Sequence, residues 1–518
     1  MTDHITLRRG VYHDSVTLLR ISRAVADTPG VTAAQVAMAT PLNVELAVQQ
    51  GFSVPPAGPD DLLVAVRGDD DAVRAGLAAL QDALAAADRA SVGARGVGAT
   101  PAPRTVRAAT REAPDAAIVL LSVPGAAVTG EAMDAIAAGR HVMIFSDNVP
   151  LSDEIALKDA GARAGVLVMG PDCGTAVIGG VGLGFANVLR APGSGGTAVG
   201  LVAASGTGAQ QLSSLLDEAG VAVSHVLGVG GRDLSREVGG RSTLAALALL
   251  DADPATGHVV VLSKPPHPAV ADTVRAAARS ARTPVSTVLL GEGGDLTTAA
   301  EQVCAAVGVS VPDWPRWIPD GAPTPGSVRG VLRGLFAGGT LADEAMLVTG
   351  PVLGDIRSNI PLRPALALPV GAGAGRVPDL AGLGHVVLDL GDDAFTAGRP
   401  HPMIDPSVRL GQIAAAGADP AVGVLLVDVV LGHGADPDPA GSLAPALRTA
   451  VTARDATHPL TVVVSLCGTG GDPQDRGAQA SALLEAGAAV FVSNAEAARY
   501  AAGLLAAPTP AGTPSEAP

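Results

Sequence analysis

Residues 391–405, GDDAFTAGRPHPMID, form the densest group of reactive side chains in this chain. Arg399 could bind a substrate carboxylate, and His401 could move a proton because imidazole titrates near neutral pH. Prolines on both sides of the histidine would hold it in place at little entropic cost. We predict that Arg399 and His401 are catalytic and that Asp392 and Asp405 contact the ligand. The alternative is a polar surface loop whose prolines only end a strand.

A second candidate is the turn formed by Ser205, Gly206, Thr207 and Gly208, between an apolar run and an amphipathic segment. A serine-hydrolase turn needs G-x-S-x-G, but Ala203 and Thr207 stand at the two glycine positions. Free N–H groups, hydroxyls and the helix dipole at such a turn favour an anion. We therefore predict phosphate binding at all four residues, with an ordinary helix cap as the alternative.

Further glycine-rich loops follow other apolar runs, and glycine allows a backbone to approach a ligand closely. They contain Gly170, Pro171, Asp172 and Cys173, then Gly230 and Gly231, then Gly432, His433 and Gly434, and finally residues 468–472. Parallel strands bring their carboxyl ends to one edge of a sheet, so these loops predict a site for phosphate or a phosphoryl compound. A lone cysteine in such a loop is more typical of a small buried residue than of a nucleophile.

The elements that must position these loops are apolar strands that alternate with helices. The pattern predicts an α/β fold with three doubly wound parallel-sheet domains and a small N-terminal α+β module. AMLVTG (345–350) is predicted as a strand. The expected segments are a module at 1–95, domains at 105–192, 195–310 and 344–507, a Pro-rich linker at 311–343 and a disordered tail at 508–518.

The composition restricts the partners and the compartment. A net charge of −16 argues against binding to nucleic acid or to an anionic membrane surface, although a small anionic substrate stays possible. Three scattered cysteines without C-x-x-C spacing favour a reducing cytoplasm and no metal site. No apolar run approaches the ~20 residues that cross a bilayer. We expect a cytoplasmic protein.

Four phrases resemble the FdrA family, a branch of the succinyl-CoA synthetase superfamily: MGPDCGTAVIGGVGLGFANVLR, GLVAASGTGAQQ, SHVLGVGGRDLS and DDAFTAGRPHPMIDPSVR. Residues 112–180 resemble the second half of the synthetase CoA-binding domain. Residues 195–308 resemble the ligase domain that follows it, and residues 345–505 resemble the carboxyl-terminal domain of the other synthetase subunit. The resemblance implies a phosphate site built from two helix N-termini, at residues 205–208 and 432–434. It also makes CoA a possible ligand of the loops at 170–173 and 230–231, Asp392 and Asp405.

The chain also departs from the synthetase pattern. GEGGDLTTAAEQ (291–302) has no histidine where the family carries its phosphohistidine, and Ser263 and Lys264 stand where the supporting glutamate is expected. The first half of the CoA-binding domain and an ATP-grasp domain are both missing.

The resemblance and the departures together imply a subunit of a phosphate-dependent transferase. The specific expectation is an oxamate carbamoyltransferase, which converts oxalurate and inorganic phosphate to oxamate and carbamoyl phosphate with the help of other subunits. One alternative is an ADP-forming acyl-CoA synthetase that acts with an ATP-grasp partner and uses His401 as its histidine. Another is a non-catalytic scaffold or regulatory subunit.

Overall fold

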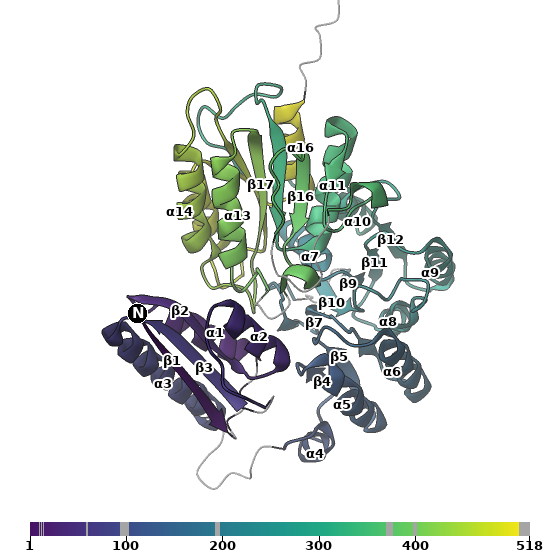
Figure 1. Cartoon of the computed structure of the whole chain (residues 1–518). Coiled ribbons are helices and arrows are strands. Elements are labelled where there is room, and N and C mark those ends of the chain that lie inside the picture. Colours follow the sequence, from purple (N-terminus) through teal and green to yellow (C-terminus); the bar gives the residue numbers. More distant parts are fainter. Residues whose placement is uncertain are drawn as a thin grey trace, which may run out of the picture. The chain divides into compact units, whose positions relative to one another are not determined.

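The structure is a computed structural model that describes residues 1–9, 11, 13, 15–58, 61–93, 103–191, 197–368, 377–396 and 401–506. The chain divides into two compact units. The first unit holds Met1–Arg104 with Thr396–Pro400, and the second holds Thr105–Phe395 with His401–Pro518. The expected α/β class with a small N-terminal module is confirmed (Figure 1).

The first unit is a three-stranded sheet of order β1-β3-β2, antiparallel at both pairings. Its elements are β1 (Thr2–Arg9), α1 (Ser15–Ala26), β2 (Val31–Met38), α2 (Pro41–Gln49), β3 (Asp61–Gly68) and α3 (Asp70–Gly93). Leu62, Val64 and Val66 of β3 pack with residues of α1 and α3 in one cluster. Leu63 and Ala65 pack with Phe52 in another. Both faces of β3 are therefore buried, which explains its nearly continuous apolar sequence.

The second unit contains three sheets. The first is parallel, with order β4-β5-β6. Its elements are α4 (Val106–Glu112), β4 (Ile118–Leu121), α5 (Gly125–Ala137), β5 (His141–Ile144), α6 (Leu151–Ala164) and β6 (Val168–Met169).

The second sheet has six strands in the order β12-β11-β9-β10-β7-β8. Its elements are β7 (Thr175–Ile178), β8 (Val181–Gly184), β9 (Val199–Ala204), α7 (Gly206–Glu218), β10 (Val223–Gly228), α8 (Arg241–Ala252), β11 (His258–Ser263), α9 (Pro268–Ser280), β12 (Val285–Leu289) and α10 (Leu296–Ala306). Strands β12, β11, β9 and β10 are parallel, and the β7–β8 hairpin extends the sheet antiparallel to β10. The hairpin thus joins this sheet, although its residues fall in the segment expected at 105–192.

The third sheet has seven strands in the order β13-β19-β18-β17-β14-β16-β15, parallel except for β13. Its elements are β13 (Arg316–Trp317), β14 (Val331–Phe336), α11 (Gly339–Leu353), β15 (Ile356–Arg357), a 3-10 turn (Pro364–Leu366), β16 (His385–Asp389), α12 (Asp393–Thr396), α13 (Ser407–Ala418), β17 (Val422–Val430), α14 (Pro439–Thr452), β18 (Thr461–Cys467), α15 (Arg476–Glu485), β19 (Ala488–Phe491) and α16 (Asn494–Leu505).

Two expectations for this part of the chain are wrong. AMLVTG lies in α11 and is helical, and the strand that opens the third domain is β14, inside the expected linker 311–343. A short apolar run cannot by itself separate a buried strand from a buried helix. In β14 the apolar run is interrupted by Arg333 and Gly334, so the sequence pattern does not predict a strand there.

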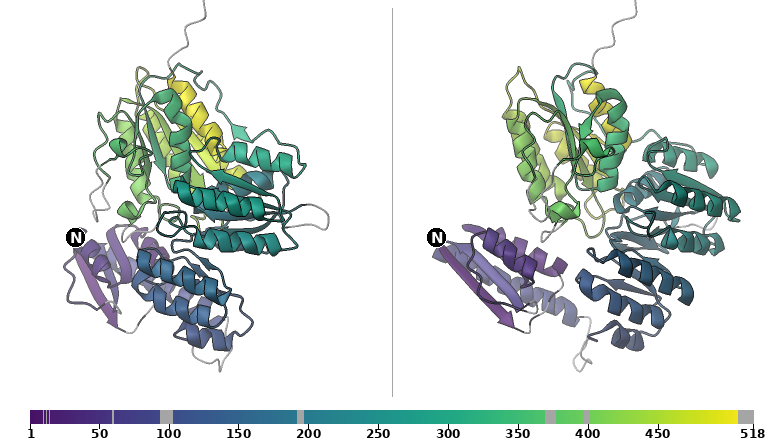
Figure 2. Two further views of the ribbon diagram at one scale, coloured as in Figure 1. Left: turned by 90° about the vertical axis from the view of Figure 1, so that its right-hand side faces the viewer. Right: turned by 45° about the vertical axis from the view of Figure 1, so that its right-hand side comes forward.

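The second and third sheets share one hydrophobic core. A single buried cluster contains residues of both sheets and of the helices between them. It includes Leu201 of β9 and Leu215 of α7, together with Phe336 of β14, Leu341 of α11 and Phe491 of β19. Figure 2 shows both sheets with their covering helices in two views. Because one core serves both sheets, the loops at their carboxyl ends are held at fixed positions relative to each other.

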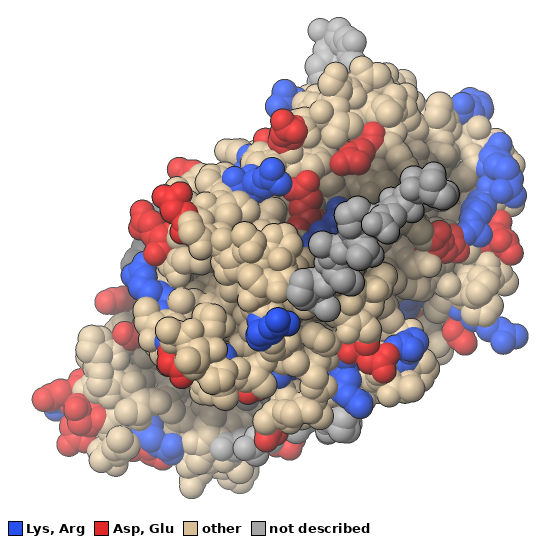
Figure 3. All heavy atoms as spheres, turned by 90° about the horizontal axis from the view of Figure 1, so that it is seen from above, with Lys and Arg blue, Asp and Glu red and all other residues tan. Residues whose placement is uncertain are grey.

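Charges of both signs lie on the surface of the molecule. On the face drawn in Figure 3, basic and acidic residues are interspersed with one another. Within the described ranges, no helix combines the length and the apolar character that a membrane span requires.

Candidate functional site

Two helix N-termini meet where the second and third sheets share their core. Ser205 caps α7, and its Oγ accepts a hydrogen bond from the Gly208 amide at 3.0 Å. The same Oγ lies 2.5 Å from Oγ1 of Thr340, in the first turn of α11. A β-carbon added to Gly338 would stand 2.8 Å from the Thr207 side chain. The N-terminal turns of α7 and α11 are therefore in direct contact.

A buried ion pair fixes the start of α11. Asp428 of β17 accepts hydrogen bonds from the amides of Ala337 (2.7 Å) and Gly338 (2.9 Å). Arg409 donates to the same carboxylate at 2.9 Å and to the Asp428 carbonyl at 2.7 Å. Burial raises the pKa of Asp428, and Arg409 opposes that shift. These bonds hold the turn between β14 and α11 in one conformation.

Lys264 and Asp389 come together at the first residue of α11. A β-carbon added to Gly339 would stand 2.5 Å from Asp389 Oδ2 and 3.0 Å from Lys264 Nζ. Lys264 follows β11 and Asp389 ends β16, so both lie at the carboxyl ends of parallel strands. Burial raises the pKa of Asp389 to about 7, while Lys264 and the Gly391 amide lower it. Burial also raises the pKa of Asp343, on α11, to about 6.

His401 lies beside Asp389, above the end of β16. A β-carbon added to Gly391 would stand 2.6 Å from His401 Nε2 and 3.2 Å from Asp389 Oδ1. Burial, with a smaller effect of Arg409, lowers the pKa of His401 to about 4, so the imidazole is neutral at pH 7. Its Nδ1 accepts from the Met403 amide at 3.3 Å, which assigns the proton to Nε2. His401 is thus arranged to donate a hydrogen bond from Nε2.

The raised pKa of Asp389 predicts a pH-dependent stability. The folded state retains a proton that the unfolded chain, with a pKa near 3.9, has released. The free energy of unfolding should therefore fall by up to about 1.4 kcal/mol for each pH unit between about pH 5 and 7 on account of this residue. Asp389→Asn should remove that contribution, as measured by denaturant unfolding across this range.

His401 contributes a pH dependence of the opposite sign, because its pKa is lowered in the folded state, and this contribution is present in both proteins. The informative quantity is the difference in slope between the native chain and Asp389→Asn. Identical slopes in the two proteins would show that Asp389 has an ordinary carboxyl pKa.

The loops at 170–173 and 230–231 pack against each other. A β-carbon added to Gly230 would stand 2.4 Å from the Pro171 carbonyl oxygen, and one added to Gly228 would stand 2.6 Å from Cys173 Sγ. Cys173 is buried, and burial raises the pKa of its thiol to about 12. The expectation that Cys173 and Gly230 contact a ligand is therefore corrected, since the space beside them is filled by the chain itself.

Asp172, in the same loop, differs from its neighbours because its side chain is exposed. Loss of solvation by the neighbouring protein atoms raises the pKa of Asp172 to about 6, and Asp393 adds to the shift, whereas Lys264 opposes it. Gly231 has open space, with only Asp172 Oδ2 within 4 Å of an added β-carbon, at 3.9 Å. Asp172 is therefore the member of this loop that faces the Lys264 region.

The expectation that residues 432–434 supply the second helix N-terminus is wrong. His433 pairs with Ala186 through two backbone hydrogen bonds, and Gly432 bonds to Gln474 through both its amide and its carbonyl. The helix that follows, α14, begins only at Pro439 and is capped by its own Asp438. The helix that meets Ser205 is α11, which follows strand β14.

The structure describes part of the segment 391–405. Arg399 lies outside the described residues. The carboxylates of Asp392 and Asp405 accept hydrogen bonds from the amides two residues further on, Ala394 (2.9 Å) and Ser407 (3.0 Å), so both stabilise local turns. Of the proposed residues in this segment that the structure describes, His401 lies near the α11 N-terminus.

Sequence reasoning missed Thr340, Asp343 and Asp389 and gave Lys264 no role. Lys264 and Asp389 both follow or end an apolar strand, which is the signal that could have identified them. Thr340 could not be found in this way, because the preceding strand β14 was not recognised.

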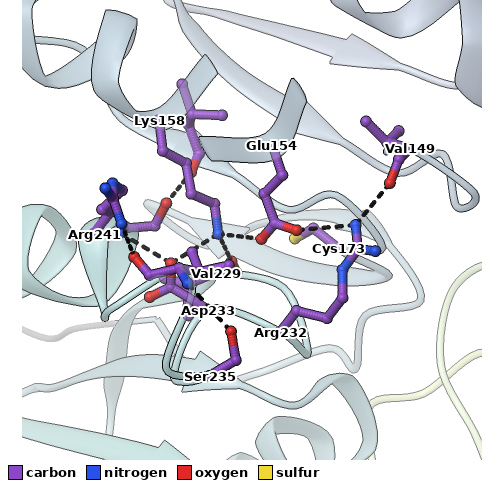
Figure 4. Close-up of polar contacts among 12 residues, drawn as sticks. Val149, Glu154, Lys158, Cys173, Val229, Arg232, Asp233, Ser235 and Arg241 are labelled. Carbon is purple, nitrogen blue, oxygen red and sulfur yellow. Dashed lines mark hydrogen bonds and ion pairs between the residues drawn. The ribbon is translucent and has the colours of Figure 1, made fainter. Parts of the chain in front are cut away.

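A buried charge cluster anchors the loop at 228–233 to α6 (Figure 4). Lys158 Nζ donates to Glu154 (2.8 Å), Asp233 (2.7 Å) and the Val229 carbonyl (3.1 Å). Asp233 also accepts from the Thr243 amide at 2.8 Å at the start of α8. Arg232 pairs with Glu154 at 2.9 Å. This cluster links the first and second sheets, and its charged groups are paired with one another.

Comparison with known proteins identifies the family. Residues 1–100 match the model described as AllF, heavy metal-associated domain, and residues 335–504 match the CoA-ligase model. The chain is 35% identical over 513 residues to the uncharacterized protein YahF of Escherichia coli K12, covering 94% of this chain and 95% of YahF. The chain belongs to the AllF/FdrA-like CoA-ligase family.

Other similarities of this family member are more distant. It is 31% identical over 163 residues to the succinate–CoA ligase [ADP-forming] subunit alpha 2 of Archaeoglobus fulgidus, covering 31% of this chain and 54% of that subunit. Among solved structures, a dinucleotide forming acetyl-coenzyme A synthetase 1 of Ca. Korarchaeum cryptofilum, in complex with phosphate and ADP, matches at 16% identity with a TM-score of 0.29, covering 79% of this chain and 86% of that one. ATP citrate lyase of Methanothrix soehngenii, in complex with citrate and coenzyme A, matches at 15% identity with a TM-score of 0.31, covering 40% and 38%.

The N-terminal match names heavy-metal association, and soft metal ions prefer thiolate ligands. Residues 1–100 contain no cysteine. The described part of the chain also contains no group of three or more His, Cys, Asp or Glu side chains that could hold a metal ion. The residues present do not fit a heavy-metal site.

Proposed function

We propose that this chain is a subunit of a phosphate-dependent group-transfer enzyme that forms an acyl or carbamoyl phosphate. The specific reaction proposed is the phosphorolysis of oxalurate to oxamate and carbamoyl phosphate. The observation that carries the proposal is the contact between the N-termini of α7 and α11, at Ser205 and Thr340, with Lys264 Nζ beside Gly339. Two neighbouring helix N-termini, with an ammonium group beside one of them, favour a multiply charged oxyanion.

The reaction needs few protein groups. A phosphate oxygen forms a bond to the carbamoyl carbon, the C–N bond breaks, and its electron pair stays on the oxamate nitrogen. The proton of hydrogen phosphate supplies the hydrogen that this nitrogen requires, so no oxidant or nucleotide is consumed. Asp389, with a pKa of about 7, is suited to relay that proton, and His401 Nε2 can donate a hydrogen bond to the carbonyl oxygen.

Acyl-CoA ligation with an ATP-grasp partner is the second candidate. The CoA-ligase match over residues 335–504 favours it, as does a neutral His401 close to the start of α11. In that reaction His401 would accept a phosphoryl group. In its present tautomer Nε2 of His401 carries a proton, which would have to leave before a phosphoryl group could bind there.

Thr340→Val tests the phosphate site, because the change removes one hydroxyl at nearly constant volume. We expect calorimetry to show phosphate binding to the native chain and about tenfold weaker binding to Thr340→Val, equal to about 1.4 kcal/mol. The matched control is Thr349→Val in the same helix, where the hydroxyl donates to the Ala345 carbonyl at 2.6 Å.

The same titrations are repeated with CoA, and oxalurate turnover is followed by 31P NMR with any proteins that co-purify. Formation of carbamoyl phosphate from phosphate would support phosphorolysis. CoA binding without phosphate binding would overturn it and favour the ligase.

A further inference from the structure

Strand β1 is a long edge of the three-stranded sheet in the first unit (Figure 1). Among the residues that the structure describes, β1 pairs with β3 on one side and with no strand on the other. It has eight residues, whereas the longest edge strand of the second unit, β12, has five. Unpaired backbone N–H and C=O groups along such an edge are a surface to which another strand can add.

The two edges of this sheet differ in regularity. The pairing of β2 with β3 is irregular between Val31 and Ala33, and an irregularity of this kind is one device that keeps an edge from pairing further. The pairing of β1 with β3 runs without a shift from Thr2 to Arg9. The sequence of β1, TDHITLRR, contains neither proline nor glycine. β1 is therefore the edge of this sheet that is better suited to accept another strand.

The charges of β1 make it complementary to a second copy of itself. The acidic residue Asp3 lies near the start of the strand, and Arg8 and Arg9 lie at its end. When two copies run antiparallel, the acidic end of each lies beside the basic end of the other. Opposite charges that face each other across two strands contribute about 0.2–1 kcal/mol, whereas like charges destabilise the pair. A parallel arrangement of two copies would bring the like charges together.

Two-fold symmetry restricts the register of an antiparallel pair. Successive side chains of a strand point to opposite faces, and residues directly opposite each other point to the same face. An axis perpendicular to the sheet therefore pairs odd positions with odd ones and even positions with even ones. With the axis at Thr6, Asp3 lies opposite Arg9 of the second copy, and Ile5 lies opposite Leu7. This register matches charge with charge and apolar side chain with apolar side chain.

The neighbouring registers do not achieve this match. An axis at Ile5 would place Asp3 opposite Leu7, and an axis at Leu7 would place Ile5 opposite Arg9. The register centred on Thr6 also continues the existing packing, because Ile5 and Leu7 are partly buried against the cluster that contains Phe52.

The carboxylate of Asp3 is already held in place for this contact. Arg67 of β3 donates to its two oxygens at 2.6 and 2.7 Å. A carboxylate can accept further hydrogen bonds, and the Arg9 side chain is exposed. An ion pair between Asp3 and Arg9 of the second copy would therefore require the ordering of one flexible side chain instead of two.

We propose that β1 pairs antiparallel with β1 of a second copy of this chain, in the register centred on Thr6. The two three-stranded sheets then form one sheet of six strands, and the first unit is a dimerisation module. The interface is isologous, so each copy contributes the same residues and the assembly closes at two chains. This inference does not depend on the transfer reaction proposed above.

Thr6→Cys tests the register, because a residue on the two-fold axis lies opposite its own copy. Directly opposite residues have Cα atoms about 4.5–5.5 Å apart, which is within the range of a disulfide. The native cysteines Cys173, Cys304 and Cys467 are buried, so the introduced thiol is the accessible one. Mild oxidation of the full chain with diamide should give a disulfide-linked dimer on a non-reducing gel.

Thr2→Cys is the matched control for this experiment. Residue 2 lies on the same strand and is more exposed than residue 6, so random collisions would cross-link it at least as readily. In the proposed register the two copies of residue 2 lie about 27 Å apart, at about 3.4 Å per residue over eight steps. We expect no disulfide-linked dimer from this variant.

Sedimentation velocity measures the association of the native chain. We expect a dimer with a dissociation constant on the order of micromolar, because one pair of strands forms a small interface. Arg9→Glu turns two favourable charge pairs into two unfavourable ones and should weaken the dimer at least about tenfold. Arg74→Glu makes the same change of charge at an exposed residue of α3 that pairs with Asp71, and it should leave the association unchanged.

Four results would each overturn the inference. The mass of a single chain at every concentration up to about 100 μM would exclude the dimer. Equal cross-linking of Thr6→Cys and Thr2→Cys would exclude the register, and so would a dimer that Arg9→Glu does not weaken. A dimer that Thr6→Cys does not cross-link would place the contact elsewhere on the chain. Phosphate binding is measured separately, so none of these results decides the proposed function.

Discussion

Asp233→Ala is expected to lower the free energy of unfolding of the second unit by about 3–5 kcal/mol, because it breaks a buried ion pair from one side. Asp233 accepts from Lys158 and from the Ser242 amide through one oxygen, and from Thr243 through the other. Without it, the Lys158 ammonium keeps only Glu154 and a carbonyl, and the start of α8 loses its acceptors. Urea unfolding followed by circular dichroism measures the loss.

Asp159→Ala is the matched control for this change. Asp159 pairs with Arg241 in the same region, but its side chain is 42% exposed. An exposed pair contributes about 0–1 kcal/mol. If Asp233→Ala cost no more than Asp159→Ala, the cluster in Figure 4 would not hold the first and second sheets together.

Gly339→Ala is expected to reduce phosphate affinity by more than about tenfold, or about 1.4 kcal/mol. The new methyl group would stand 2.5 Å from Asp389 Oδ2 and 3.0 Å from Lys264 Nζ, so both side chains must move away from the start of α11. Lys264 is half-buried and can move away, whereas the Asp389 carboxylate is buried and bonded to the Gly391 amide. Calorimetry measures the loss of affinity, and the melting temperature measures the cost to the fold of displacing Asp389.

Gly350→Ala controls for the effect of alanine in the same helix. An added β-carbon at Gly350 meets no atom within 4 Å, and alanine in a helix is about 0.5–1 kcal/mol more favourable than glycine. This variant should bind phosphate normally. Unchanged phosphate affinity in Gly339→Ala would place the phosphate site elsewhere.

Local features of the chain were predictable from the sequence, whereas the partners of those features were not. The Ser205 turn has the residues of a helix cap and an apolar strand before it, and it forms the cap of α7. Its partner Thr340 lies 135 residues away, and no local pattern links the two. Gly432 and Gly434 have the composition of a ligand loop, but here their glycines allow close packing against the backbone at Ala186 and Gly184. Glycine content alone does not distinguish a ligand from another chain segment.

The candidate site joins the N-terminus of α7 to that of α11, and one polypeptide carries both helices. The segment between α10 and β14 is pinned where β13 pairs with β19, so it is held and does not act as a free tether. In an enzyme made of separate subunits, the encounter of the two helix N-termini depends on protein concentration. In this chain it is intramolecular, and dilution leaves the effective concentration of each half unchanged. The contact between Ser205 and Thr340 should therefore persist at any dilution at which the chain stays folded.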